Sequence, residues 1–212
     1  MAVDKEKYLA ILNGLEEKKV TLVAVSKTKP QEDILSLYEL GHKDFGENYV
    51  QELVDKQESL PADIKWHFIG HLQSNKVKYI APFVDLIQSV DSSKLLSEIN
   101  KQGIKFQRKI KCLLQIYIAT EETKFGLDEN ELDEILNSSS DLPGVEICGL
   151  MGMSSFTEDQ EQVKKEFKKL KSLFDKYPSL KTLSMGMSMD YQVAIEEGSN
   201  MVRIGSLLFG NR

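Results

Sequence analysis

The chain has 212 residues, 41% of them hydrophobic, and a formal net charge of −6 at pH 7. This length supports one sizeable hydrophobic core, so we expect a single domain over residues 1–212. The acidic balance gives no general attraction to nucleic acid or to an anionic membrane, and no apolar stretch has the length of a bilayer span or the pattern of a secretory signal, so we expect a cytoplasmic protein.

The distribution of apolar residues predicts one helix and then eight strands. The helix covers residues 4–17. Short runs rich in β-branched and other apolar residues then alternate with stretches of helical period, which is typical of βα units in a parallel sheet. The predicted strands cover residues 21–26, 43–46, 66–70, 86–90, 110–118, 145–151, 182–185 and 201–204.

The segments between these strands carry helix signals. An apolar stripe at helical spacing ends just before Gly103, a residue type that commonly stops a helix. Thr157 and Gln160 predict a capping box at the start of a later helix, and Asp128 with Glu131 predicts another.

Eight strand and helix units without a Pro-, Gly- or Ser-rich linker favour a closed (β/α)8 TIM barrel over an open doubly wound sheet. The helix at 4–17 is then an extra N-terminal element. The length is at the low end for this fold, which leaves no residues for a second domain. In such barrels, active sites lie at the C-terminal ends of the strands, and the loops after the seventh and eighth strands often hold phosphate.

Serines and glycines gather around the ends of the last two predicted strands. Ser184, Gly186 and Ser188 belong to the seventh strand and its loop, and Gly205 and Ser206 follow the eighth. Glycines let backbone N–H groups approach a phosphate closely, and hydroxyls donate hydrogen bonds to it. One such loop is ordinary turn chemistry, but two neighbouring ones favour a phosphate site.

Lys27 closes the first predicted strand and so lies at the rim of the barrel. Partial desolvation or a cationic neighbour would lower the pKa of this lysine, and a neutral amine attacks an aldehyde. The alternative is a surface lysine that begins a loop beside Lys29 and Pro30. Position alone slightly favours the surface lysine.

His67 and His71 are four residues apart, which in an extended strand places them on one side. No third Asp, Glu or Cys follows at ligand spacing. We therefore predict structural or pocket-lining histidines here and no metal-binding residues.

Several longer motifs occur in order along the chain. They cover residues 24–30, 45–52, 66–76, 149–151, 183–188 and 202–206. In these motifs the chain closely resembles the YggS/PROSC family of pyridoxal 5′-phosphate (PLP) homeostasis proteins, which are related in fold to the N-terminal barrel of alanine racemase. The resemblance covers nearly the whole chain and implies the same barrel, with PLP as the cofactor.

The resemblance also implies a role for each matching residue. Lys27 corresponds to the lysine that holds PLP as a Schiff base, and Arg203 to the arginine that faces the pyridine nitrogen. Asn48 corresponds to a pocket residue beside the cofactor ring, and Lys124 to a second lysine near the mouth. The phosphate-binding turns correspond to Ser184, Gly186, Ser188, Gly205 and Ser206, the last of which is often threonine in the family.

Arg203 bears on what the bound cofactor could do. PLP is a strong electron sink when its ring nitrogen is protonated, and an arginine has no acceptor with which to share that proton. The chain also has no counterpart of the second domain and the tyrosine base of alanine racemase. We therefore predict a non-catalytic, monomeric PLP-binding protein that buffers the cofactor or delivers it to PLP-dependent apoenzymes, with effects on amino-acid balance.

Two alternatives are kept. One is a PLP-dependent enzyme such as a weak amino-acid racemase, and the other is a Schiff-base aldolase that acts on a phosphosugar without a cofactor. The colour of the protein and its activity distinguish the three hypotheses. The carrier and the racemase are expected to be yellow, and only the racemase turns over amino acids. The aldolase is expected to be colourless.

Overall fold

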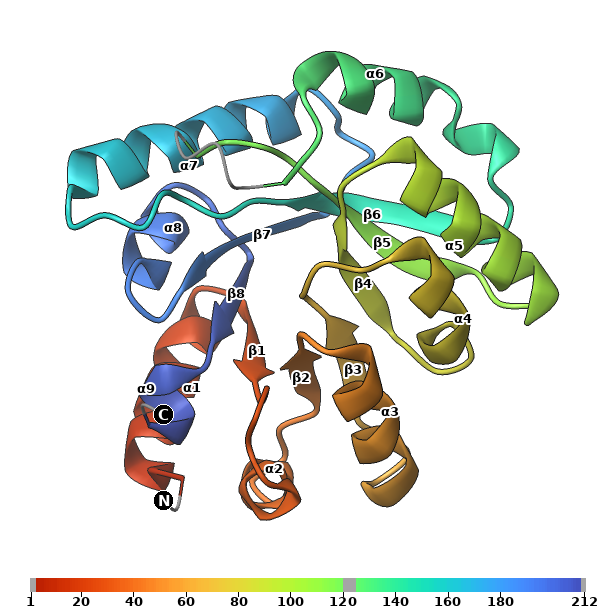
Figure 1. Ribbon diagram of the computed structural model, residues 1–212. Coiled ribbons are helices and arrows are strands. Elements are labelled where there is room, and N and C mark those ends of the chain that lie inside the picture. The colour runs from red at the N-terminus through yellow and green to blue at the C-terminus, as the bar shows by residue number, and fades with distance from the viewer. Residues whose placement is uncertain (1–2, 120–124, 211–212) are drawn as a thin grey trace.

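Eight parallel strands close into a barrel in the computed structural model, which describes residues 3–119 and 125–210 (Figure 1). Each strand pairs with the next, and β8 returns to β1 in the register that places Val202 beside Leu22. The prediction of a (β/α)8 barrel is confirmed. The strands are β1 (Thr21–Val25), β2 (Asp44–Glu47), β3 (Lys65–Phe68), β4 (Leu86–Val90), β5 (Ile110–Gln115), β6 (Val145–Met151), β7 (Thr182–Met187) and β8 (Met201–Ile204).

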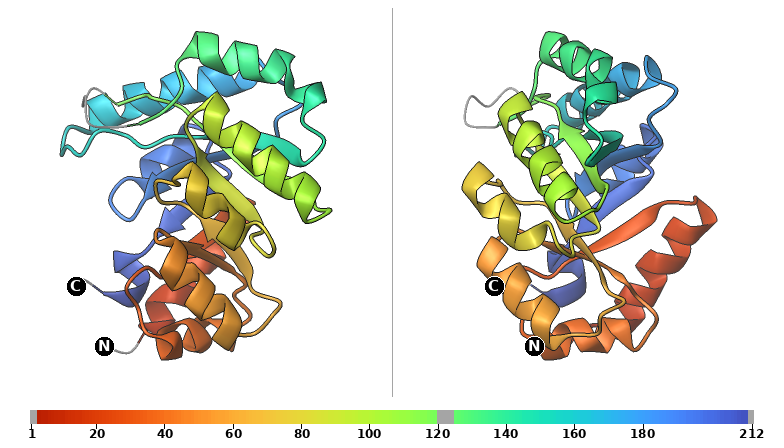
Figure 2. Two further views of the ribbon diagram at one scale, coloured as in Figure 1. Left: turned by 45° about the vertical axis from the view of Figure 1, so that its right-hand side comes forward. Right: turned by 90° about the vertical axis from the view of Figure 1, so that its right-hand side faces the viewer.

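Helices surround the barrel (Figure 1). α1 (Lys5–Glu17) precedes β1 as the predicted extra element. The last helix, α9 (Ser206–Phe209), packs against α1, so the two ends of the described chain lie close together in all views (Figures 1 and 2). The helices that follow are α2 (Gln31–Tyr38), α3 (Val50–Ser59), α4 (Val77–Ile80), α5 (Ser93–Lys105), α6 (Glu129–Asn137), α7 (Gln160–Asp175), α8 (Tyr191–Glu196) and α9 (Ser206–Phe209), with short 3-10 turns η1 (Ser74–Lys76) and η2 (Ser139–Asp141).

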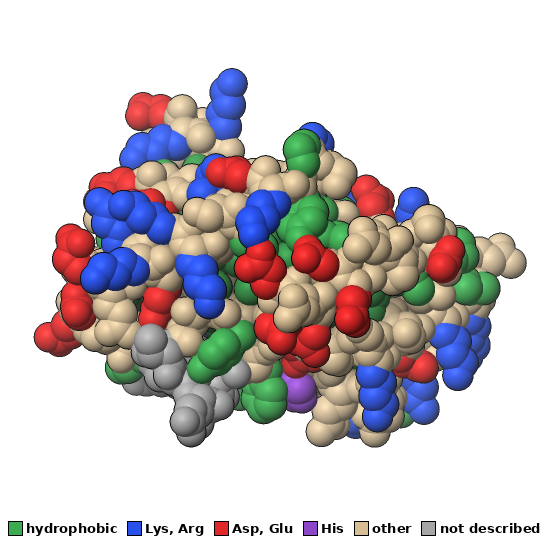
Figure 3. Space-filling view, turned by 90° about the horizontal axis from the view of Figure 1, so that it is seen from above, with side chains coloured by type: hydrophobic (Ala, Val, Ile, Leu, Met, Phe, Trp, Pro, Cys, Tyr) green, Lys and Arg blue, Asp and Glu red, His purple; other side chains and the backbone are tan. Residues whose placement is uncertain are grey.

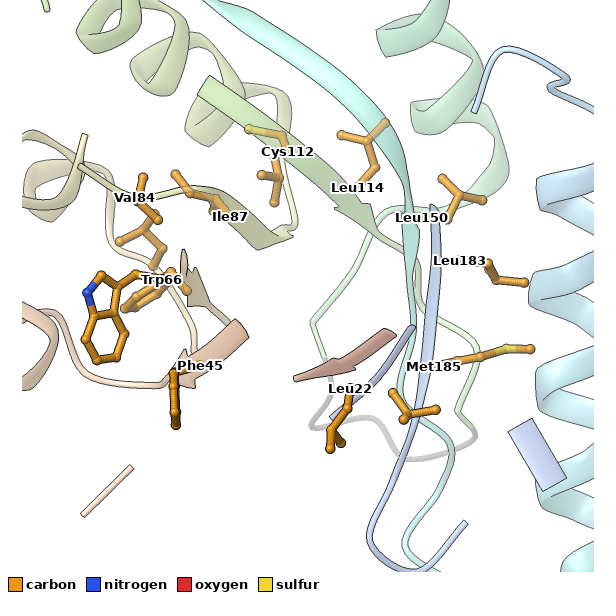
Figure 4. Packing of buried hydrophobic residues seen from close by; sticks show 14 of the residues in the cluster. Leu22, Phe45, Trp66, Val84, Ile87, Cys112, Leu114, Leu150, Leu183 and Met185 are labelled. Carbon is orange, nitrogen blue, oxygen red and sulfur yellow. The ribbon is translucent and has the colours of Figure 1, made fainter. Parts of the chain in front are cut away.

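The outer face of the barrel is apolar and packs against the helices. Successive strand residues point to opposite faces of a sheet, so every second side chain points outward. Figure 4 shows this outward ring, which includes Leu22, Phe45, Trp66, Ile87, Leu114, Leu150 and Leu183. Each large apolar side chain that is fully buried contributes about 1.5–3 kcal/mol. The layer between sheet and helices is therefore the main source of stability.

The interior of the barrel is a mixed column of apolar and polar side chains. Its apolar part is a separate cluster formed by Val23, Leu86, Leu113, Met151 and Met201. Further inward positions on β3, β4, β7 and β8 carry buried polar side chains, namely His67, Gln88, Ser184 and Arg203. The interior therefore contains groups that must find hydrogen-bond partners.

Several predicted strand ends differ from the structure, those of β5 and β3 among them. β5 ends at Gln115 because the chain then leaves the sheet and makes only an isolated bridge between Ile116 and Leu127. β3 ends before His71, which is exposed, whereas His67 is buried inside the barrel. The prediction that these two histidines share one side of a strand is therefore wrong.

The predicted helix caps are half correct. The box at Asp128 is confirmed: its carboxylate accepts the Glu131 N–H at 2.9 Å, and the Glu131 carboxylate accepts the Asp128 N–H at 2.9 Å. The box at Thr157 and Gln160 is wrong, because Asp159 caps α7 by accepting the N–H groups of the second and third residues after it. Aspartate is at least as good an N-cap as threonine, and here it lies next to the helix.

Gly103 does not stop α5 but lies inside it. A Cβ built on Gly103 would stand 2.2 Å from the carbonyl oxygen of Gly144. Only glycine allows the helix to approach the segment before β6 this closely. Gly103, which the sequence suggests as the end of a helix, is therefore needed for close packing of the backbone.

We expect alanine to have opposite effects at two helical glycines. Gly103→Ala should destabilise the protein by about 1–3 kcal/mol, because the new methyl group forces the backbone apart. Gly14→Ala, inside α1, should stabilise it by about 0.5–1 kcal/mol, because no atom lies within 4 Å of the new Cβ and glycine weakens a helix. Urea unfolding measures both changes, and effects of the same sign would contradict this explanation.

The outer face of α7 is charged. Lys165, Lys168 and Lys169 are exposed, whereas Phe167 and Leu170 on the opposite side are buried. Figure 3 shows basic side chains over α7 at the left of this face, interspersed with acidic ones. Within the described ranges, no helix has the length and apolar character needed to cross a membrane.

Candidate functional site

A pocket of about 600 Å³ opens at the C-terminal ends of the strands. Its lining comes from the segments that follow β1, β2, β3, β6, β7 and β8. This is the end of the barrel where the sequence predicts the site. Six of the eight predicted site residues line it: Lys27, Asn48, Ser188, Arg203, Gly205 and Ser206.

A buried network of charges fixes the chain on both sides of Lys27. The Lys56 ammonium group, on α3, donates to the Ser26 carbonyl oxygen at 2.8 Å. It also lies 2.7 Å from a carboxylate oxygen of Glu47 and 2.7 Å from one of Glu52. The Ser26 hydroxyl donates to Glu47 at 2.6 Å, and the N–H of the residue after Lys27 donates to Glu52 at 2.6 Å. The backbone that carries Lys27 is thus held by two carboxylates and a lysine.

Glu47 is the most deeply buried member of this network. Its side chain is completely buried, and that burial raises the pKa of Glu47, although the Lys56 ammonium opposes the effect. One of its two carboxylate oxygens has no hydrogen-bond partner. Burying such a pair costs solvation energy that the attraction between the charges only partly offsets. We therefore interpret the network as a device that positions the backbone rather than as a source of stability.

Arg203 is buried at the inner end of the pocket. Its Nη1 donates to the Ser184 hydroxyl at 2.6 Å, and its Nη2 donates to the Gly152 carbonyl oxygen at 3.1 Å. Burial lowers the pKa of Arg203 to about 10, although the nearby Asp190 carboxylate opposes the effect. A pKa well above 7 keeps the guanidinium protonated at neutral pH. Arg203 is therefore cationic at pH 7.

The turns after β7 and β8 meet at the pocket. The Gly205 N–H donates to the Ser188 hydroxyl oxygen at 3.2 Å, and Ser206 is exposed at the start of α9. The Asp190 carboxylate accepts the Met187 N–H at 2.6 Å and so braces the first of these turns. Two hydroxyls and a backbone N–H therefore come together where the two loops meet.

Ser184 and Gly186 do not line the pocket. Ser184 is fully buried in the barrel interior, where it accepts from Arg203 and donates to Gln88 Oε1 at 2.7 Å. Gly186 has a φ of +96°, and a Cβ there would lie 2.6 Å from the Cβ of Ala194, so α8 packs directly on it. The structure places both residues behind the pocket wall.

Asn48 lines the pocket and carries an unpaired side-chain oxygen. Its Oδ1 is buried and has no hydrogen-bond partner. The backbone of Asn48 is held close to Gly70, where a Cβ would stand 2.2 Å from the Asn48 carbonyl oxygen. A buried acceptor without a partner costs about 1–3 kcal/mol, so this oxygen is suited to accept a hydrogen bond from a ligand. The other predicted lysine of the mouth, Lys124, lies outside the described residues.

The loop between β6 and α7 forms a side of the pocket that the sequence did not reveal. The Ser154 hydroxyl donates to Asp190 at 2.6 Å, which ties this loop to the turn after β7. The Ser155 N–H and hydroxyl both donate to the buried Glu166 carboxylate, at 2.6 and 2.7 Å. Phe156 follows with a largely exposed ring. In the sequence, the only indication that this loop belongs to the pocket is its position after a barrel strand.

The fold and the family comparison define the class of this barrel. The family model described as "Alanine racemase, N-terminal domain" matches residues 5–212. A curated relative from Aquifex aeolicus named "Pyridoxal phosphate homeostasis protein" is 43% identical over 205 residues, which cover 94% of this chain and 90% of the relative. A relative of the same name from Escherichia coli is 38% identical over 217 residues, which cover 99% of this chain and 93% of the relative. The chain therefore belongs to the pyridoxal phosphate homeostasis protein family, as the motifs predict.

Solved structures agree with this assignment. PipY of Synechococcus elongatus without PLP superposes with a TM-score of 0.90 at 34% identity, covering 97% of this chain and 99% of PipY. The structure of PipY with PLP bound superposes with a TM-score of 0.87, at the same identity and coverage. Alanine racemase from Bartonella henselae superposes with a TM-score of 0.75 at 17% identity, and this chain covers 59% of that protein. That last likeness concerns the barrel fold alone.

Proposed function

We propose that this protein binds PLP in the pocket at the C-terminal ends of the strands and takes part in PLP homeostasis by buffering or delivering the cofactor. One observation carries the proposal: Lys27, Arg203 and the serines of two neighbouring turns line a single pocket. A homologue of the same family, PipY, has a structure with PLP bound. In this proposal Lys27 holds PLP as a Schiff base.

The pocket fits such a ligand. About 600 Å³ is within the usual range for small-molecule sites. Val25 and Ile69 offer apolar surface to an aromatic ring, and Asn48 Oδ1 offers an unused acceptor. The hydroxyls of Ser188 and Ser206 offer hydrogen bonds to a phosphate, and the Gly205 N–H supports Ser188 by donating to its oxygen, with Ser184 and Gly186 behind them. When bound, PLP supplies an aldehyde and an electron-withdrawing pyridine ring.

Lys27 and Arg203 then act on different atoms of the ligand. With PLP bound, Lys27 would be the residue that holds its aldehyde carbon through a C=N bond, with the carbonyl oxygen released as water. Arg203 stays cationic and has no acceptor, so it would face the ring nitrogen as a donor only and could not share a proton with it. Carbanion chemistry is weakly supported in this arrangement.

The proposal therefore favours a non-catalytic carrier over a racemase. Racemisation needs a proton donor or acceptor on each face of the substrate. Among the described residues that line the pocket, Lys27, Glu158 and Asp190 are of suitable types, and the Asp190 carboxylate already accepts from the Ser154 hydroxyl and the Met187 N–H. The alternative, a weak amino-acid racemase, is tested by incubating the PLP-loaded protein with single enantiomers of amino acids. Racemisation that depends on Lys27 and clearly exceeds that of free PLP would establish the enzyme instead.

The proposal also concerns the domain organisation of the protein, its oligomeric state and the recipients of its cofactor. We propose that residues 1–212 act as one PLP-binding domain, that the protein works as a monomer in the cytoplasm, and that PLP-dependent apoenzymes receive its cofactor. The family of the chain and the position of the pocket support the role in PLP handling. Size-exclusion chromatography with light scattering tests the monomer.

Removing both hydroxyls from the turns should weaken phosphate binding. We expect Ser188→Ala combined with Ser206→Ala to raise the dissociation constant for PLP at least about 100-fold, because hydrogen bonds to charged groups contribute about 1.5–3 kcal/mol each. Binding of pyridoxal, which lacks the phosphate, should change less than about twofold. Titration followed by absorbance measures both, with Ser36→Ala on α2 as the control. Unchanged PLP binding would contradict the phosphate assignment.

A further inference from the structure

A chain of hydrogen bonds crosses the barrel interior from Arg203 to the N-terminal end of β2. Arg203 Nη1 donates to Ser184 Oγ at 2.6 Å, and Ser184 Oγ donates to Gln88 Oε1 at 2.7 Å. Gln88 Nε2 lies 3.0 Å from His67 Nδ1. His67 Nε2 lies 3.1 Å from Asp44 Oδ1. The four contacts join side chains from β8, β7, β4, β3 and β2.

The chain is shielded from water over most of its length. Ser184 and Gln88 are completely buried, and His67 and Arg203 are 2% and 3% exposed. Gln88 Nε2 also lies 3.3 Å from the sulfur of Met201, which belongs to the apolar cluster of the interior. No solvent is at hand to replace a bond that is lost in such surroundings, so each link must be satisfied by its neighbour.

Arg203 sets the direction of every bond in the chain. A guanidinium group only donates, so the Ser184 oxygen must accept from it and use its own proton on Gln88 Oε1. The Gln88 amide then presents its NH2 group to His67 Nδ1, which must accept. All donors therefore point away from the pocket.

His67 completes the chain with one ring nitrogen accepting and the other donating. With Nδ1 accepting, its proton lies on Nε2 and is donated to the Asp44 carboxylate. Burial on its own would raise the pKa of Asp44, but the hydrogen bond from His67 and the charge of Lys65 oppose this effect, and the pKa of Asp44 is lowered. An ionised carboxylate is the strongest acceptor available at this end.

We propose that Ser184, Gln88, His67 and Asp44 are positioning residues that hold the Arg203 guanidinium in the orientation it presents to the pocket. The contact from Nη2 to the Gly152 carbonyl oxygen fixes one corner of the planar group, and the chain fixes the other. The importance of this orientation for the ring nitrogen of PLP rests on the proposed function. The chain itself is a property of the protein without ligand and is testable there.

The first test uses the unmutated protein without PLP. Long-range 15N–1H NMR of the histidine rings at pH 7.5 reports which nitrogen of His67 is protonated. We expect the proton on Nε2 and an unprotonated Nδ1. A proton on Nδ1, alone or in an imidazolium ring, would overturn the proposed direction of the chain. This measurement needs no variant and so does not depend on whether a variant folds.

The second test compares two substitutions of one residue. His67→Asn keeps an acceptor near the position of Nδ1, whereas His67→Leu removes it. We expect hydrogen exchange of the Arg203 guanidinium protons to rise about tenfold in His67→Leu and less than about twofold in His67→Asn. His71→Leu is the matched control, because His71 is exposed and outside the chain. Equal exchange in the Leu and Asn variants would overturn the positioning role.

A PLP titration of the same unmutated protein separates this inference from the proposed function. Covalent uptake of PLP at Lys27 together with a proton on His67 Nδ1 would overturn the inference and leave the proposed function standing. The expected His67 form in a protein that does not take up PLP would support the chain and contradict the proposed function.

Discussion

Replacing Lys27 with alanine is expected to remove the visible absorption band of the PLP-loaded protein and to weaken retention of PLP at least about 100-fold. The covalent bond to the lysine is lost, and only hydrogen bonds to the phosphate and contacts with the ring remain to hold the cofactor. The pocket itself should persist, because the network of Lys56, Glu47 and Glu52 holds the backbone on either side of residue 27.

Two measurements make the Lys27 result specific. Lys18→Ala removes an exposed lysine before β1, at the opposite end of the barrel, and should keep both the band and the affinity. The melting temperature of the Lys27→Ala protein without ligand should stay close to the original, because a half-buried lysine at a loop contributes little to stability. A visible band that persists in a folded Lys27→Ala protein would contradict the assignment.

Replacing Lys56 with methionine is expected to destabilise the protein by about 3 kcal/mol. The substitution leaves the fully buried Glu47 carboxylate without its cationic partner, and only the Ser26 hydroxyl still donates to it. For a chain of this length about 2–4 °C of melting temperature correspond to each kcal/mol, so we expect a fall of about 6–12 °C. Calorimetry measures it. The control is Lys171→Met, which breaks an exposed pair with Asp175 of the same i,i+4 spacing and should cost about 0.5 kcal/mol at most.

The pH dependence of the Lys56→Met variant has a definite sign. Burial raises the pKa of Glu47, so the folded state binds its proton more tightly than the unfolded state does. The penalty of an unpaired carboxylate is therefore present at pH 7 and shrinks as the pH falls toward 5. Adding Glu47→Gln to Lys56→Met should recover most of the lost stability at pH 7. A deficit that grows toward low pH would contradict the account.

The barrel could be predicted from the sequence because its strands are buried on both faces. Such strands occur as short, nearly continuous apolar runs, and the connections between them are short and helical. The order of eight such units then places Lys27, Arg203 and Gly205 at the same end of the barrel, whatever the details of the loops. From this order alone the sequence could identify the pocket residues Lys27, Gly205 and Ser206, which lie just beyond strand ends.

The depth of a residue within a strand could not be predicted. β7 continues to Met187, two residues beyond the predicted end, so Ser184 lies three residues below the rim and faces the interior instead of the pocket. Ser188, just beyond the strand, lines the pocket instead. The two serines are equivalent in composition, and only the hydrogen-bonded length of the strand separates their roles.

Lys56 shows a second limit of the sequence. A lysine on a helix with polar neighbours is typical of a solvent-facing position. Here α3 packs so that this lysine meets the end of β2, and its ammonium group is buried with Glu47. Partners that are distant along the chain, like those of His67 and Gln88 inside the barrel, are created only by the closure of the sheet.

The most direct test of the proposed function is to load the protein with PLP, reduce it with borohydride, and map the modified peptide by mass spectrometry. Reduction makes the bond between the cofactor and its lysine permanent. The account predicts a single modified residue, Lys27, and loss of the visible band on reduction. Modification confined to other lysines, with Lys27 unmodified, would contradict it.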